Sequence, residues 1–283
     1  MELVNIEQAE YWATVAPTWI EVEDRLNEVI ELPGEMAMDR LGLRPGERVL
    51  DLGCGTGRTT LRLAERVAPG GEAVGVDITE EMVARARGHA ALASGLHVEF
   101  VVADVQAHDF GPDRFDAAYS RFGVMFYSDP VAAFRRVRAA LRPDGRLSFV
   151  CWQPVTANDW MFIPGAAAVS VTGSPPPMAG LDEPGPFSLS DPERVQTILS
   201  AAGFVDVDVQ PHDDFFTAPR DRVRDLALTA MRVGAARELL RGQPEEIAAR
   251  VRAAIEEALA AKVEGDEVRL SRAVLQVTAA VPA

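Results

Sequence analysis

Three glycines at alternate positions, set between an apolar segment and a helical pattern, constrain the fold of this chain more than any other feature. Residues 48–52 predict a buried strand and residues from about 57 to 68 predict a helix, so the glycines at their junction form a tight turn (Gly53, Gly55 and Gly57). Twenty residues after Gly57, Asp77 follows a second strand-like run over residues 72–76. The order of strand, glycine turn, helix, strand and acid is typical of a unit that binds an adenosine-containing cofactor.

Short connections join a regular alternation of strands and helices through the first half of the chain. Further strands are predicted over residues 97–102, 115–119 and 146–151, and helices follow the first, second and fourth strands. This alternation implies a mostly parallel α/β sheet with helices on both faces. Ligands of such sheets bind at the carboxyl ends of the strands, where the chain places Gly53, Asp77, Asp104 and Ser120.

Composition excludes several classes of partner. Of the 283 residues, 48% are hydrophobic, which is enough for a full core, and the net charge is -15. Because nucleic-acid-binding proteins carry basic stripes and this sequence has none, we expect no nucleic-acid partner. No run approaches the ~20 apolar residues of a transmembrane helix. The N-terminus lacks the basic and apolar regions of a signal peptide, so we expect a cytoplasmic protein without a membrane partner.

Cysteine, histidine and lysine are scarce, which narrows the chemistry. The two cysteines, Cys54 and Cys151, are expected to be free thiols, and the four histidines show no metal-ligand spacing, so we expect no metal. Lys262 is the single lysine of the sequence. Its position disfavours mechanisms that need a lysine in the first half of the chain, including Tyr-x-x-x-Lys dehydrogenase chemistry.

The sequence before and after the cofactor-binding core predicts additional helices and loops. The N-terminal helical pattern is expected to break at Pro33-Gly34, and the proline-rich stretch after the fifth strand predicts a long loop. A later helix is expected to take Ser190 as its N-cap. We therefore expect an N-terminal helical lid, a cofactor-binding core, a lid loop, a core helix with strand six, a helical cap insertion and the last core strand (1–42, 43–152, 153–187, 188–218, 219–265 and 266–283).

The spacing of the glycines distinguishes between adenosine cofactors. A dinucleotide fingerprint requires Gly-x-Gly-x-x-Gly, and the third glycine of that pattern is replaced here by Arg58. Asp51 stands two residues before the first glycine. A carboxylate there suits an ammonium group better than a pyrophosphate, so the pattern favours a cofactor with a cationic amino-acid end and no phosphates.

At these residues the chain resembles the class I S-adenosylmethionine-dependent methyltransferases. Val-Leu-Asp-Leu-Gly-Cys-Gly-Thr-Gly over residues 49–57 resembles the first motif of that family, and the likeness continues at least from residue 45 to residue 151. Ser-Arg-Phe-Gly-Val-Met-Phe over 120–126 and Phe-Val-Cys-Trp over 149–152 resemble a bacterial group that methylates small molecules in specialised metabolism. The resemblance implies a Rossmann-like, seven-stranded, mostly parallel sheet of strand order 3-2-1-4-5-7-6, with a helical cap formed by the N-terminus and insertions.

The resemblance also implies roles for individual residues. Asp51 would orient the turn and face the cofactor's ammonium, Asp77 would accept from the ribose hydroxyls and Asp104 from the adenine amino group. The full set expected at the cofactor is Asp51, Gly53, Cys54, Gly55, Gly57, Asp77, Ile78, Met82, Ala103, Asp104, Val105, Ser120 and Phe122. The candidates for the acceptor pocket are Tyr11, Trp12, Arg121, Trp152 and Trp160. His212 is the candidate general base if the acceptor must lose a proton, and His108 is a second one.

The expected function is S-adenosylmethionine-dependent methyl transfer to a small organic acceptor. Methyl transfer from a sulfonium is an in-line displacement, so the protein mainly aligns the reacting atoms and excludes water. Two alternatives stay open: a protein that binds S-adenosylmethionine but catalyses non-methyl chemistry such as a cyclisation, and a nicotinamide oxidoreductase, which would need the missing third glycine. The sequence leaves the acceptor atom open, and the oligomeric state open between monomer and homodimer.

Overall fold

The computed structural model describes residues 3–175, 180 and 182–283, and these divide into two compact units. Unit 1 consists of Met1–Trp152, Gly180–Pro211 and Val274–Ala283, and unit 2 of Gln153–Ala179 and His212–Ala273. The predicted lid loop includes residues 176–179 and 181, which lie outside the described residues. The six-segment division from the sequence stays a prediction.

The central sheet has the strand order expected from the sequence. Its order is β3-β2-β1-β4-β5-β8-β6, with a short strand β7 paired to β8. The last core strand, β8, therefore corresponds to strand 7 of the predicted order, and β7 adds an eighth strand. Neighbouring strands from β3 to β5 are parallel, and β8 is antiparallel to β5. The strands are β1 Arg48–Leu52, β2 Glu72–Asp77, β3 Val98–Val102, β4 Phe115–Arg121, β5 Leu141–Trp152, β6 Val205–Pro219, β7 Val263–Glu264 and β8 Glu267–Ala280.

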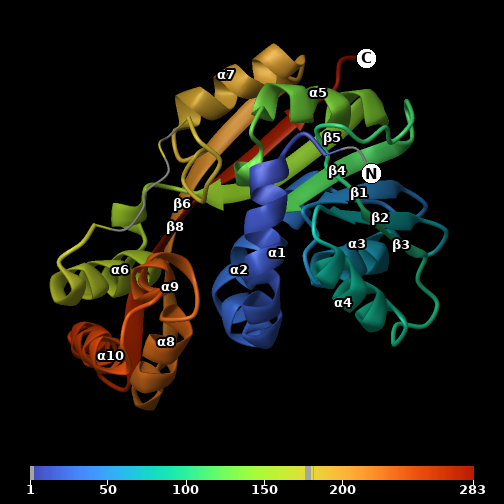
Figure 1. The fold of residues 1–283 in the computed structure, drawn as a ribbon. Helices are drawn as coiled ribbons and strands as arrows, with labels where there is room; N and C mark the ends of the chain where they lie inside the picture. Colours follow the sequence, from blue (N-terminus) through green and yellow to red (C-terminus); the bar gives the residue numbers. More distant parts are fainter. Residues whose placement is uncertain (1–2, 176–179, 181) are drawn as a thin grey trace. The chain divides into compact units, whose positions relative to one another are not determined.

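Helices cover both faces of the sheet in unit 1. On one face lie α5 (Pro130–Ala140) and α7 (Pro192–Ala202), and on the other lie α3 (Arg58–Val67) and α4 (Glu80–Ala90) (Figure 1). Both α5 and α7 begin with proline at the first helical position, behind an aspartate whose side chain accepts a backbone amide. For α7 that aspartate is Asp191, so the predicted N-cap Ser190 was wrong by one residue.

The N-terminal helices are α1 (Ile6–Glu21) and α2 (Glu23–Leu41). The expected break at Pro33-Gly34 was wrong, because α2 continues through both residues. Three buried side chains of the sheet explain this continuity, since each donates to a carbonyl of this stretch of α2. Tyr119 Oη donates to Gly34 O at 2.9 Å, Ser148 Oγ to Ala37 O at 2.8 Å and Gln276 Nε2 to Pro33 O at 3.1 Å. Tertiary hydrogen bonds thus support a helix that local propensity disfavours.

Unit 2 is mainly helical. The proline-rich segment expected to be a loop contains α6 (Asp159–Thr172), with Pro164 inside it, so the loop prediction was wrong there. Helix α6 packs against α9 (Gly234–Leu240) and α10 (Glu245–Ala260), and α8 (Val223–Ala230) packs against α10. The predicted apolar stripe of α10 is buried at Val251, Ile255 and Leu259. Short 3-10 turns occur at η2 (Val155–Ala157) and η3 (Arg220–Arg222), and η1 (Val124–Phe126) belongs to unit 1.

Asn158 ties α6 to the start of β8 within unit 2. Its side chain is fully buried and pairs with Ala273 in both directions. Oδ1 accepts the Ala273 amide at 2.9 Å, and Nδ2 donates to the Ala273 carbonyl at 3.1 Å. Nδ2 also lies 3.3 Å from the carbonyl oxygens of Gln153 and Pro154. The side chain thus joins the segment before α6 to β8 through three backbone carbonyls and one backbone amide.

We predict that Asn158→Ala lowers the free energy of unfolding by at least about 2 kcal/mol, because each buried polar group left unpaired costs about 1–3 kcal/mol. Urea unfolding followed by circular dichroism measures the change. The control is Gln243→Ala at an exposed position of the same unit, expected within about 0.5 kcal/mol of the unchanged protein. Equal stability of the two variants would contradict this role of Asn158.

Candidate cofactor site

The three glycines of the turn between β1 and α3 lie in three different environments. All three have positive φ, with 69° at Gly53, 52° at Gly55 and 81° at Gly57. A Cβ on Gly53 would lie 2.8 Å from Cα of Gly123 in the loop after β4, so two glycines meet where the loops touch. A Cβ on Gly57 would lie 2.7 Å from both Ala86 and Phe100. Nothing lies within 4 Å of a Cβ on Gly55, which therefore faces open space.

Most amides of this turn are already used inside the protein. The amides of Gly53 and Cys54 both donate to the carbonyl of Val76, at 2.8 and 3.0 Å, and that of Gly57 donates to the carbonyl of Cys54 at 3.0 Å. The Gly55 amide donates to the Asp77 carboxylate at 2.9 Å. Phosphate-binding turns instead point their amides at the ligand. The turn supplies close approach for a ligand, and not a set of donors for phosphates.

Asp51 lies at the end of β1, fully buried beneath the turn. Its Oδ2 accepts the hydroxyls of Thr59 and Thr60, both at 2.6 Å, from the first turn of α3. Its Oδ1 is buried and has no hydrogen-bond partner among the described residues. Burial raises the pKa of Asp51 to about 6, although both threonine hydroxyls act to lower it. An unpaired carboxylate oxygen at this depth suits a cationic group, and the predicted role of Asp51 toward an ammonium group stays a prediction.

Asp77 ends β2 and holds the turn. Its Oδ2 accepts the Gly55 amide and its Oδ1 accepts the Thr79 amide, both at 2.9 Å. Burial raises the pKa of Asp77, against the effect of these two amide bonds. Each carboxylate oxygen can accept a second hydrogen bond, so the predicted role toward a ribose remains compatible with these contacts.

Asp104, after β3, fastens the N-terminal segment to the site. Its Oδ2 accepts the amides of Val4 and Asn5, at 2.9 and 2.8 Å, and its Oδ1 accepts the amide of Gln106 at 3.0 Å. The Asn5 side chain donates to the carbonyl of Phe126 at 2.8 Å. The sequence did not predict this use of Asp104. An adenine amino group would find acceptor capacity chiefly on Oδ1, because Oδ2 already accepts two bonds.

The remaining residues predicted on the adenosine side are mostly buried. Met82, Ala103 and Val105 are buried, and Ile78 is partly exposed directly after Asp77. Cys54 packs with Val83, Ala86 and Phe100 in one core cluster, and burial raises the pKa of its thiol. Cys54 thus contributes packing under the turn.

Ser120, Phe122 and Trp152 surround the carboxyl ends of β4 and β5. Ser120 Oγ donates to the Leu52 carbonyl at 2.7 Å and accepts the Gly123 amide at 3.2 Å, which joins the two loops. Phe122 has a φ of 62°, an uncommon value for a bulky residue. Its ring stacks on Trp152 with centroids 3.9 Å apart. The local backbone strain places an aromatic pair at the edge where the ligand is expected.

A charged cluster that the sequence did not predict joins α2 to the turn and to α4. Glu23 is buried, and its Oε1 accepts from Arg85 at 2.7 Å and lies 3.6 Å from His89 Nε2. The other ring nitrogen of His89 lies 2.9 Å from the carbonyl of Thr56. Burial acts to raise the pKa of Glu23, but the hydrogen bond from Arg85 and the nearby positive charges outweigh it, so the pKa is lowered. The N-terminal helices are thereby held at both the turn and Asp104.

Tyr127 is a second residue that the sequence did not indicate. Its hydroxyl is buried without a hydrogen-bond partner among the described residues. Burial raises its pKa, and the negative charges of Asp104 and Asp77 act in the same direction. An apolar neighbour, Phe134, packs edge-on against its ring at 5.9 Å.

The predicted acceptor residues divide between the two units. In unit 1, Trp12 packs edge-on against Tyr11, Trp19 and Phe126, at 5.7, 5.4 and 5.0 Å. Arg121, at the end of β4, donates to Asn27 Oδ1 at 2.9 Å. Trp160 and His212 belong to unit 2.

The candidate base His212 lies 3.5 Å from Asp214 in unit 2. Asp214 also receives a bidentate pair from the buried Arg272, at 2.7 and 2.6 Å. Asp214 therefore forms a structural ion pair with Arg272 in addition to its contact with His212. A catalytic role of His212 therefore stays a prediction.

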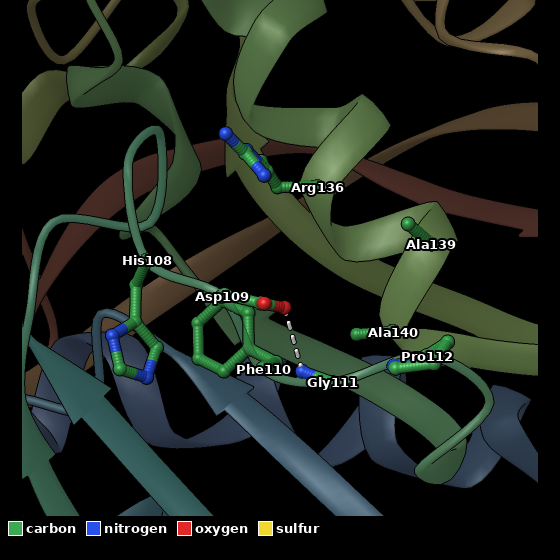
Figure 2. A pocket seen from close by; sticks show the side chains of 8 residues that line it. All are labelled: His108, Asp109, Phe110, Gly111, Pro112, Arg136, Ala139 and Ala140. Carbon is green, nitrogen blue, oxygen red and sulfur yellow. Dashed lines mark hydrogen bonds between the residues drawn. The ribbon is translucent and has the colours of Figure 1, made fainter.

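His108, the second candidate base, lines a different cavity. Figure 2 shows this cavity of about 110 Å³ between the loop after β3 and the end of α5. The His108 ring packs edge-on against Phe110 at 4.6 Å, and Asp109 accepts the Gly111 amide at 2.9 Å. Since α5 ends here and β5 begins, the cavity reaches toward the amino edge of the sheet, away from the glycine turn.

Neither a metal centre nor a membrane span is found in the described part of the chain. No cluster of three or more histidine, cysteine, aspartate and glutamate side chains is arranged to hold a metal ion. No described helix combines the length and the apolar character needed to cross a membrane.

The sheet is doubly wound, Asp77 stands at the end of β2, and the amides of the glycine turn are hydrogen-bonded within the protein. These features define a Rossmann-like protein for a nucleoside cofactor. Residues 49–145 match the family model described as a methyltransferase domain. The match shows a methyltransferase domain over these residues of the chain.

Individual relatives resemble the chain over part of their length. Nocamycin O-methyltransferase of Saccharothrix syringae is 36% identical over 180 residues, which are 60% of this chain and 63% of that protein. The structure of YcgJ from Bacillus subtilis has a TM-score of 0.55 at 21% identity and covers 88% of this chain and 97% of its own. Phosphoethanolamine N-methyltransferase 2 of Haemonchus contortus gives 0.53 at 20%, over 89% and 52%. At these identities the structures share the fold alone. The chain spans less than two thirds of the curated relatives it matches.

The raised pKa of Asp51 predicts that its contribution to stability falls as the pH rises from about 4 to about 6. The unfolded carboxyl ionises near 3.8, whereas the folded protein holds this proton until about pH 6, so folding takes up a proton between these values. At about 1.4 kcal/mol per pH unit, the loss reaches about 3 kcal/mol.

Urea unfolding at pH 4, 5, 6 and 7 measures this effect in the unchanged protein and in Asp51→Asn. Other carboxylates titrate in both proteins, so the difference between them isolates Asp51. A difference that stays constant with pH would refute the raised pKa.

Proposed function

We propose that this chain is a methyltransferase that transfers the methyl group of S-adenosylmethionine to a small organic acceptor in specialised metabolism. The observation that carries the proposal is the glycine turn. Its amides at Gly53, Cys54, Gly55 and Gly57 are bonded internally, while the unpaired oxygen of Asp51 is buried beside it. Such a turn suits a cofactor with a cationic end better than one with phosphates.

The relatives support the acceptor class. The protein that is 36% identical to this chain is named as an O-methyltransferase of nocamycin, a small molecule. Phosphoethanolamine N-methyltransferase 3 of Arabidopsis thaliana, 35% identical over 123 residues, is also named for a small acceptor. The net charge of -15 adds a physical reason against a polyanionic acceptor.

The residues present fit the cofactor. The open side of Gly55 gives room for close approach, and the free Oδ1 of Asp51 offers an acceptor for an ammonium group. Asp77 and Asp104 would hold the ribose and the adenine through acceptor capacity that their backbone contacts leave unused.

S-adenosylmethionine supplies an activated methyl group on a sulfonium, so the chain's task is alignment and exclusion of water. Positioning of this kind contributes up to about 7–11 kcal/mol of barrier lowering. Ser120 and Gly123 fix the loop beside the turn, and the Phe122–Trp152 stack walls the same edge with buried apolar surface. The N-terminal helices, fastened at Asp104 and Glu23, would shield the site from water. His212 would act only for an acceptor that must lose a proton.

Isothermal titration of the purified chain with S-adenosylmethionine, S-adenosylhomocysteine and NAD tests the cofactor. We expect binding of the first two and none of NAD. Tight binding of NAD alone would favour the oxidoreductase alternative. Incubation with small phenolic, amine and carboxylic acceptors, followed by mass spectrometry for S-adenosylhomocysteine, tests methyl transfer. An acceptor converted without release of S-adenosylhomocysteine would favour the non-methyl alternative.

Replacement of Asp77 by asparagine is predicted to weaken S-adenosylhomocysteine binding about tenfold to a hundredfold. Asparagine keeps one acceptor oxygen for the Gly55 or the Thr79 amide and loses the charge, and hydrogen bonds to charged groups contribute about 1.5–3 kcal/mol. Titration calorimetry measures the affinity, with the exposed Glu257→Gln as the matched control. An affinity of Asp77→Asn within about threefold of the unchanged protein would remove Asp77 from the site.

A further inference from the structure

Glu23 is a buried acid at the start of α2 that faces charged groups from two other helices. Its side chain is 7% exposed, and its Oε1 accepts from Arg85 of α4 at 2.7 Å and lies 3.5 Å from Arg58 of α3. Burial acts to raise the pKa of Glu23, but the hydrogen bond from Arg85, the Thr56 hydroxyl and the guanidinium charges outweigh it, so the pKa is lowered. The carboxylate is therefore ionised at neutral pH.

His89, near the end of α4, lies between this acid and the glycine turn. Its Nδ1 is 2.9 Å from the carbonyl oxygen of Thr56, and its Nε2 is 3.6 Å from Glu23 Oε1. Because a carbonyl oxygen only accepts, Nδ1 must carry a proton. A second proton, on Nε2, faces the carboxylate, whereas a bare Nε2 turns a lone pair toward it. The imidazolium is therefore the form of the ring that satisfies both neighbours.

The remaining charges of this cluster balance one another. The guanidinium groups of Arg58 and Arg85 oppose a positive charge on His89. The carboxylates of Glu23 and Asp24 favour it, and Asp24 is an exposed acid that pairs with Arg58. Since the two acids balance the two guanidinium groups, the acceptor atoms beside the ring decide its preferred charge.

The bond from His89 to the Thr56 carbonyl holds one peptide plane of the glycine turn. That carbonyl and the Gly57 amide belong to the same planar peptide. The amide donates to the carbonyl of Cys54 at 3.0 Å, so both sides of the peptide are held. The residue before it, Gly55, is the glycine of the turn whose Cβ position faces open space. His89 therefore connects the docking of α2 to the wall of the candidate cofactor site.

We propose that His89 is a positioning residue which, as an imidazolium, joins Glu23 of α2 to the Thr56 carbonyl, so that affinity for the cofactor falls as the pH rises. This inference rests on the proposed function and adds a pH-dependent control of the same site. When the ring loses one proton, it keeps either the bond to the carbonyl or the pair with the acid, and one of the two links is lost. Histidine changes its charge between about pH 5 and pH 8, so the fall in affinity belongs to that range.

Titration calorimetry with S-adenosylhomocysteine, from about pH 5.5 to about pH 8.5, tests this assignment. The variant His89→Asn offers an amide near the position of Nδ1 but has no proton that titrates. We expect its dissociation constant to exceed that of the unchanged protein about threefold to tenfold at the acid end, and the ratio of the two to approach one at the alkaline end. Asp51 titrates in both proteins, so its effect cancels in the ratio.

Two neighbouring acids provide a matched pair of variants. Glu23→Gln keeps the size of the buried side chain and removes its charge, so we expect the same pH-dependent ratio as for His89→Asn. Asp24→Asn is the control, because Asp24 also pairs with Arg58 but its side chain is 80% exposed. Its dissociation constant is expected to stay within about twofold of that of the unchanged protein at every pH.

A ratio for His89→Asn that does not vary with pH overturns the assignment, and so does an equal loss in Asp24→Asn and Glu23→Gln. Should His89→Asn not fold, as circular dichroism would show, Glu23→Gln provides the test. Hydrogen exchange of the ligand-free protein at pH 6 and pH 8 separates this inference from the proposed function. We expect the protection of α2 to fall with pH more in the unchanged protein than in Glu23→Gln, after correction for the intrinsic exchange rates. If S-adenosylhomocysteine does not bind but this difference is found, the proposed function fails and the link between α2 and the turn stands. If it binds and the difference is absent, the link alone is refuted.

Discussion

The Asp77 carboxylate accepts the Gly55 amide at 2.9 Å, and the shape of the whole site follows from this kind of contact. Beside it, Asp51 accepts two threonine hydroxyls from the first turn of α3. Side chains at the ends of two strands thereby hold a turn whose positive φ angles only glycine adopts without strain. Because these contacts satisfy the turn internally, it can exist without a ligand. The same contacts leave one buried carboxylate oxygen unpaired, at the place where a cation would bind.

The N-terminal helices are built into this site. Backbone amides of Val4 and Asn5 occupy Asp104, and Glu23 binds Arg85 beside the glycine turn. Buried donors from the sheet hold the carbonyls of α2 around its proline and glycine. This helix therefore tolerates residues that would end a helix in isolation. The glycine in turn makes room for the Arg121 side chain, since a Cβ on Gly34 would lie 2.5 Å from Cδ of Arg121.

Local sequence patterns were sufficient to predict the strands of the core. They were insufficient to predict α6 and the first residue of α7. Strand ends at Leu52 and Val102 follow from apolar runs bounded by turn residues, and the sheet order agrees with the family resemblance. The proline-rich loop prediction failed because α6 contains Pro164 and is stabilised by packing against α9 and α10. The N-cap of α7 was misplaced by one residue, since Ser190 and Asp191 are both good caps and only geometry chooses between them.

The sequence by itself determined the class of cofactor, because glycine spacing and the acids at strand ends reflect local backbone geometry. It placed Asp51, Asp77 and Asp104 at one edge of the sheet, since the carboxyl ends of parallel strands meet there. Only the tertiary structure decided what those acids contact: the threonines of α3, the turn amide and the N-terminal amides. It also decided that the Tyr127 hydroxyl is buried without a hydrogen-bond partner among the described residues, because that state depends on residues distant in the chain. Long-range satisfaction of buried polar groups leaves no periodic trace in a sequence.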